Sequence, residues 1–115
     1  MTYEIQISFK NKSGQLLSYN EYKYSGKTPE VDGLDRARKI VNDYFKNIDT
    51  VDIEVFEKGK PVGFNAYKKH MFLNESLYFK IRNILSKYDG NEEVSATRIL
   101  TEVKREIVQH GDEYE

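Results

Sequence analysis

The alternation of residues 3–10 constrains the fold more than any other feature of the sequence. The apolar positions are Tyr3, Ile5, Ile7 and Phe9, and a polar residue follows each of them. Because successive side chains of a β-strand point to opposite faces, this pattern predicts a strand with one face toward a core. The turn-forming residues 11–15 follow, with Gly14 placed to adopt the positive φ that closes a short hairpin.

The second predicted strand covers residues 16–24 and returns antiparallel to the first. It is rich in β-forming residues, but its apolar side chains fall into two phases. Leu17 and Tyr19 belong to one face, whereas Leu16, Tyr22 and Tyr24 belong to the other. An extra residue in one strand shifts its alternation by one, so we expect a β-bulge near Asn20.

A helix is predicted next, beginning with Asp32 as its N-cap. Its apolar residues recur every three or four positions, at Leu34, Ala37, Val41, Tyr44, Phe45 and Ile48. A third strand follows over residues 51–56, and the turn at residues 58–60 leads into a fourth strand over residues 62–67. Two hairpins with a helix between them predict a four-stranded, mostly antiparallel sheet with the helix on one face.

The last third of the chain is predicted to form two helices that pair antiparallel. The first begins near Asn74 and ends at Gly90, and the second covers about residues 92–109. The expected fold is therefore α+β with the element order ββαββαα in one domain, residues 1–115. Within it, residues 1–67 form the sheet and first helix, residues 72–110 the helix pair, and residues 111–115 a frayed tail.

Composition excludes several classes of protein. The chain has 115 residues, no cysteine and no apolar run of the length that a membrane-spanning helix needs. Disulfides, thiolate nucleophiles and cysteine-ligated zinc are excluded by the lack of cysteine. The first residues do not resemble a secretory signal, so we expect a cytoplasmic protein that does not bind membranes.

No motif predicts catalysis, a metal site or a cofactor. Residues 26–28 read Gly-Lys-Thr, the end of a phosphate-binding P-loop, but Glu21 occupies the position of the required first glycine. His70 has no histidine or cysteine near it in the sequence, and His110, four residues after Glu106, is explained by a position at a helix C-terminus. No Gly-x-Ser-x-Gly string is present either. We therefore expect a protein that is not an enzyme and that binds no metal and no cofactor.

Charge is unevenly distributed, although the net charge is only −1. Residues 1–67 are neutral, residues 68–90 carry an excess of three positive charges, and residues 91–115 an excess of four negative charges. An acidic second helix argues against a helix-turn-helix that inserts this helix into DNA. A basic stripe remains as a candidate nucleic-acid interface, made of Lys68, Lys69, Lys80, Arg82 and Lys87.

Aromatic side chains provide a second candidate surface. We expect four of them on the sheet face away from the first helix, where they would bind a protein partner. They are Tyr22, Tyr24, Phe56 and Tyr67. The alternative is that the C-terminal helix pair folds over this face and buries them in a second core layer.

These observations predict a small, non-enzymatic protein that docks on a protein partner. An accessory protein of a phage or mobile element, which inhibits a host or defence enzyme, fits the size and the absence of catalytic motifs. The alternative is a nucleic-acid-binding module that uses the basic stripe. A third hypothesis is a small enzyme whose site is assembled from scattered carboxylates or His70. A homodimer through the aromatic face is compatible with all three.

Overall fold

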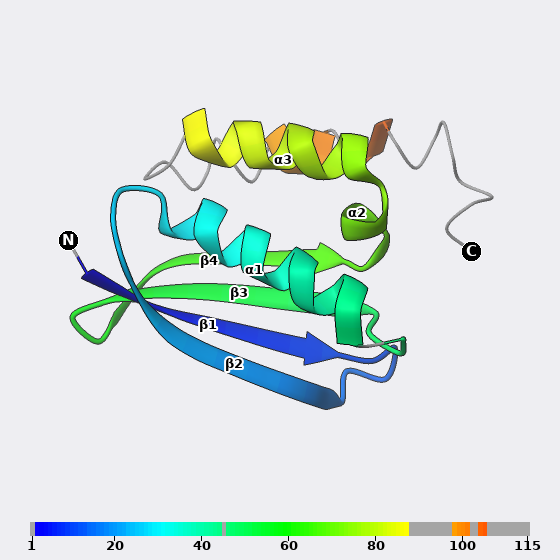
Figure 1. Cartoon of the computed structure of the whole chain (residues 1–115), viewed down its shortest axis with the longest axis horizontal. Coiled ribbons are helices and arrows are strands. Elements are labelled where there is room, and N and C mark those ends of the chain that lie inside the picture. The colour runs from blue at the N-terminus through cyan, green and yellow to red at the C-terminus, as the bar shows by residue number, and fades with distance from the viewer. Residues whose placement is uncertain (1, 45, 88–97, 102–103, 106–115) are drawn as a thin grey trace.

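The computed structural model describes residues 2–44, 46–87, 98–101 and 104–105. Four strands form one antiparallel sheet in the order β2-β1-β3-β4, and the helices lie beside it (Figure 1). The α+β class and the antiparallel four-stranded sheet are therefore confirmed. The elements are β1 (Thr2–Lys10), β2 (Leu16–Ser25), α1 (Pro29–Tyr44), β3 (Thr50–Glu57), β4 (Lys60–Lys68), α2 (His70–Leu73) and α3 (Glu75–Lys87).

The side chain of Asn11 and backbone hydrogen bonds together hold the β1–β2 turn. The Oδ1 atom of Asn11 accepts hydrogen bonds from the backbone N–H groups of Ser13 and Gln15, each at 3.0 Å. Gly14 adopts a φ of 81°, as its position in the sequence predicts. These contacts fix the register with which β2 returns along β1.

The bulge in β2 lies closer to this turn than expected. The β1–β2 register shifts between Phe9, which pairs with Ser18, and Lys10, which pairs with Leu16. The extra residue is therefore Leu17, and the prediction of a bulge near Asn20 is wrong. A second shift in the β3–β4 pairing leaves Val62 as the extra residue of β4. Each bulge changes the phase of an edge strand.

Helix α1 covers one face of the sheet, where the core forms. It begins at Pro29, three residues before the predicted cap, because a proline at the first helical position needs no N–H partner. Gly33 allows the helix to approach closely, since a Cβ atom here would lie 2.9 Å from Cγ2 of Ile53. The helix ends at Tyr44, yet Ile48 beyond it is buried in the same core.

Helices α2 and α3 extend this core on the same side of the sheet. Helix α2 was not predicted, and it buries Met71 and Phe72. Helix α3 begins after Asn74, whose Oδ1 atom accepts a hydrogen bond from Leu77 N–H at 3.0 Å, as predicted for an N-cap. It lies beside α1 (Figure 1). Its buried residues are Leu77, Tyr78, Ile81 and Leu85.

Two ion pairs join α3 to α1. Arg38 Nη2 lies 2.7 Å from Glu75 Oε1, and Arg82 Nε lies 3.1 Å from Asp35 Oδ1. Residues 98–101 are also helical, and Ile99 is buried in the same core. The rest of the predicted last helix, the pairing of the two C-terminal helices and the tail at residues 111–115 lie outside the described residues. No helix in the described part of the chain has the length and apolarity to cross a membrane.

Candidate functional site

The sheet face opposite α1, here called the open sheet face, presents polar and apolar side chains in regular rows. Strand β1 places Glu4, Gln6, Ser8 and Lys10 on it, because Ile5, Ile7 and Phe9 are buried under α1. The register places Glu21 and Glu54 on either side of Gln6. The same alternation brings Tyr19 beside Ser8 on β2, and Phe64 beside Glu54 on β4.

Large apolar side chains lie at the two edges of this face. Tyr19 on β2 is 47% exposed and Phe64 on β4 is 56% exposed. We call Tyr19 and Phe64 the edge aromatics. The bulge residues Leu17 and Val62 are exposed as well, one on each edge strand. Exposed aromatic and aliphatic side chains of this kind are typical anchors of protein interfaces.

Carboxylates occupy the middle of the open sheet face. Glu4, Glu21 and Glu54, here called the acidic centre, come from three neighbouring strands. The pKa of the Tyr19 hydroxyl is raised by desolvation, by the hydrogen bond that it donates to Glu21 Oε2 at 2.9 Å, and by the charges of all three carboxylates. Three carboxylates on neighbouring strands make this part of the face acidic.

Asp52 contributes a further carboxylate to the same face, next to Ser8. Its Oδ2 atom lies 2.8 Å from Lys10 Nζ, so this charge is compensated within the sheet. Lys23, which pairs with Glu4 on the same face, offsets one charge of the acidic centre. An excess of two negative charges remains there, with the edge aromatics beside it.

The predicted placement of the aromatic side chains is wrong for three of the four residues. Tyr22 and Tyr24 pair with Ile5 and Tyr3, and Tyr67 pairs with Val51, so all three point toward α1. Only Phe56, which pairs with Glu4, lies on the open sheet face, where it is half-buried. Binding of a protein by any of these four side chains remains a prediction.

The three misplaced tyrosines have structural contacts in the core layer. Tyr22 Oη donates a hydrogen bond to Asp32 Oδ2 at 2.7 Å, and the Arg36 guanidinium lies 3.7 Å from the centre of the Tyr22 ring. Burial and the bond to Asp32 raise the pKa of Tyr22. Tyr67 is 2% exposed and packs edge-on against Phe72. These contacts connect the sheet to α1 and α2.

Sequence reasoning missed the edge aromatics, although a signal for both was present. Tyr19 follows Leu17 by two residues, a spacing that predicts the same face for both. Phe64 and Tyr67 are three residues apart, which is an odd spacing. In a strand without a bulge between them, residues at odd spacing point to opposite faces. Once Tyr67 is assigned to the core, Phe64 therefore falls on the open sheet face.

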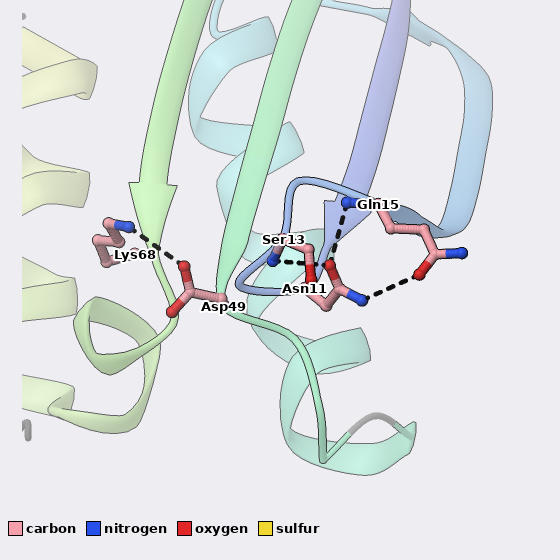
Figure 2. Close-up of polar contacts among 5 residues, drawn as sticks. All are labelled: Asn11, Ser13, Gln15, Asp49 and Lys68. Carbon is pink, nitrogen blue, oxygen red and sulfur yellow. Dashed lines mark hydrogen bonds and ion pairs between the residues drawn. The ribbon is translucent and has the colours of Figure 1, made fainter.

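The five residues of the predicted basic stripe do not form one surface. Lys68 and Lys69 lie at the end of β4 and line a pocket that includes none of the other three. Lys80, Arg82 and Lys87 belong to α3, where Arg82 is engaged with Asp35. Lys68 Nζ lies 3.2 Å from Asp49 Oδ2 (Figure 2). Binding of nucleic acid by these residues remains untested.

His70 is the described histidine, and it lies at the same pocket. Its pKa is lowered by burial and by the charge of Lys68, with Asp49 acting in the opposite direction. Within the described residues, no three histidine, aspartate or glutamate side chains are placed to hold a metal ion. His110 lies outside the described residues.

Comparisons of the chain with family models, with curated proteins and with solved structures found no match. The candidate surfaces are therefore inferred from the residues that form them. They are the open sheet face and the pocket at the end of the sheet.

Proposed function

We propose that this chain is a cytoplasmic, non-enzymatic protein-binding module whose open sheet face receives a basic surface of its partner. The exposure of the edge aromatics on either side of the acidic centre is the observation that carries the proposal. In such an interface the aromatic side chains supply apolar contact area. The carboxylates select a partner that places arginine or lysine against the middle of the sheet.

A second copy of the chain fits this face poorly. Two copies related by a two-fold axis would place identical surfaces against each other. A two-fold axis through the acidic centre would set like charges against each other, which disfavours association. The phosphates of a nucleic acid would be repelled by the same carboxylates. A different protein with a basic surface is therefore the occupant that we propose.

Enzymes that bind nucleic acids have basic surfaces of this kind. Inhibition of such an enzyme, by an accessory protein of a phage or mobile element, is the specific form of the proposal. The acidic centre would occupy the part of the enzyme that otherwise contacts phosphates. The edge aromatics would add the apolar contacts that hold the complex together.

The proposal is tested by capture with matched variants. The tagged protein and the Tyr19→Ala/Phe64→Ala double variant are used to capture proteins from a nuclease-treated bacterial lysate. Phe79→Ala is the control, because Phe79 is also about half exposed, at 51%, but lies on α3. A bound protein should be retained by the wild type and the control and lost by the double variant. Loss of an aromatic anchor costs about 2 kcal/mol or more, which weakens binding roughly 30-fold.

A charge-reversed variant tests the acidic centre separately. Glu21→Lys/Glu54→Lys should abolish capture of the same protein, because it removes the charge complementarity. Raising the salt concentration should weaken binding of the wild type for the same reason. Equal capture by the wild type, the double aromatic variant and the charge-reversed variant would exclude the open sheet face as the binding surface.

A further inference from the structure

A pocket of about 810 Å³ lies at the end of the sheet where β1 and β4 terminate. Three segments that are far apart in the sequence line it. They are the turn at residues 11–13, the α1–β3 connection at residues 46–49, and residues 68–70 with Leu73 and Asn74 after β4. Figure 2 shows Asp49 between Lys68 and the turn that holds Asn11 and Ser13. None of the residues of the acidic centre and neither edge aromatic lines this pocket.

The pocket concentrates positive charge in a chain whose net charge is −1. Its lining contains four lysines and one acidic residue, Asp49. The pocket lysines are Lys12, Lys46, Lys68 and Lys69. The bridge between Lys68 Nζ and Asp49 Oδ2, at 3.2 Å, offsets one of these charges. An excess of three positive charges remains at the pocket.

Backbone hydrogen bonds fix the segments that carry these charges. Asp49 N–H donates to the carbonyl of Lys10 at 2.8 Å, and Lys69 N–H donates to the carbonyl of Asp49 at 2.9 Å. Lys69 Nζ donates to the carbonyl of Lys46 at 2.7 Å, which ties the two lysine-bearing segments together. The bonds of Asn11 hold the turn next to them. The lysines are therefore brought together by the fold.

We infer that this pocket binds a small phosphorylated ligand of about nucleotide size. Four lysines around one pocket create a positive potential that attracts an anion. A phosphate ester carries close to two negative charges at neutral pH and has several acceptor oxygens, so it can engage several ammonium groups at once. A carboxylate has a single charge and would leave most of the excess uncompensated. Pockets of roughly 300–1,000 Å³ are typical for ligands of this size.

The remaining lining residues suit the body of such a ligand. Ser13 and Asn47 provide hydroxyl and amide groups, and Leu73, which is 57% exposed, provides an apolar wall. Polar groups beside an apolar surface are typical of small-molecule sites. The ligand would therefore direct its phosphate toward the lysines and its organic part toward Leu73.

The inference is tested by isothermal titration calorimetry with ATP, AMP and inorganic phosphate at constant ionic strength. The Lys12→Ala/Lys46→Ala variant removes two exposed pocket lysines without touching the core. Lys23→Ala/Lys60→Ala is the matched control, because both lysines are exposed and neither lines the pocket. We expect ATP or AMP to bind the wild type and the control. The pocket variant should bind it at least about tenfold more weakly.

His70 provides an independent readout of the same site. An anion in the pocket should raise the pKa of His70. Its negative charge would offset the effect of the pocket lysine Lys68, which lowers this pKa, and would act in the same direction as Asp49. An NMR titration of the His70 ring with and without AMP measures this change.

Three outcomes would overturn the inference. The first is no binding of any phosphorylated probe to the wild type. The second is equal binding by the wild type and the pocket variant. The third is binding of a short oligonucleotide, but not of AMP or ATP, with affinity that falls steeply as salt rises, because it would identify a nucleic-acid interface instead.

Discussion

Truncation of two aromatic residues of β4, Phe64 and Tyr67, should destabilise the protein to very different extents. Tyr67 is 2% exposed and packs against Phe72 with 5.8 Å between ring centres. Phe64 is 56% exposed on the open sheet face. Tyr67→Ala should therefore disrupt the core, whereas Phe64→Ala should chiefly remove surface that a partner can contact.

The sizes of the two effects follow from burial. Replacing a fully buried aromatic side chain by alanine costs about 3–5 kcal/mol, because the transfer free energy is lost and a cavity remains. Full burial of a phenylalanine side chain stabilises a protein by about 1.5–3 kcal/mol. Less than half of the Phe64 side chain is buried, so its burial contributes about 1 kcal/mol. The two variants should thus differ in the free energy of unfolding by about 2–4 kcal/mol.

Urea unfolding at pH 7, followed by circular dichroism, measures this difference. For a domain of this size each kcal/mol lowers the Tm by about 4–8 °C, so Tyr67→Ala should lower it by more than about 10 °C and Phe64→Ala by a few degrees. Tyr67→Phe keeps the ring and serves as a folded reference if Tyr67→Ala does not fold. A cost for Phe64→Ala equal to or greater than that for Tyr67→Ala would refute the assignment of the two sheet faces.

Three other perturbations test the contacts around the core and the pocket. Tyr22→Phe should destabilise the protein by about 1–2 kcal/mol in urea unfolding, because it removes the 2.7 Å hydrogen bond to Asp32; an unchanged unfolding midpoint would contradict that contact. Gly33→Ala should lower the Tm despite a gain in helix propensity of about 1 kcal/mol, because overpacking against Ile53, 2.9 Å from the new Cβ atom, costs about 1–3 kcal/mol; a raised Tm would show that α1 lies farther from the sheet. The NMR titration midpoint of His70 should lie below its ordinary value of 6.5, because burial and Lys68 lower its pKa. The unfolded chain then takes up the proton at a higher pH than the folded protein, so the stability should fall as the pH drops through 6.5 toward the folded pKa. A midpoint at or above 6.5 would exclude this lowering.

Local patterns were sufficient to predict most of the elements. The alternation of residues 3–10, the glycines of both turns and the capping residue Asn74 all lie where the sequence indicates. These features depend on neighbours within a few positions, so the sequence carries them directly. The start of α1 was misplaced because Pro29 begins the helix, and α2 is too short to give a periodic signal.

The faces of the edge strands were decided by tertiary structure. Bulges at Leu17 and Val62 shift the alternation of β2 and β4, and a shift of one residue exchanges the two faces. The position of a bulge depends on the partner strand, so the sequence of one strand does not locate it. A bulge was expected near Asn20, between Tyr19 and Tyr22, whereas the bulge at Leu17 leaves these two side chains on opposite faces. Tyr22 and Tyr24 were therefore expected on the wrong face. Tyr67 was misplaced although no bulge separates it from Phe64.

The sequence by itself determined the α+β class, the two hairpins and the helix between them, because strand and helix periods and turn residues act locally. Only the tertiary structure decided which aromatic side chains are exposed, and it divided the predicted basic stripe between α3 and the end of β4. It also brought Lys12 and Lys46 next to Lys68 and Lys69 at one pocket. Those lysines come from three segments of the chain that are more than twenty residues apart. Long-range packing of the strands, which no local pattern encodes, places them together.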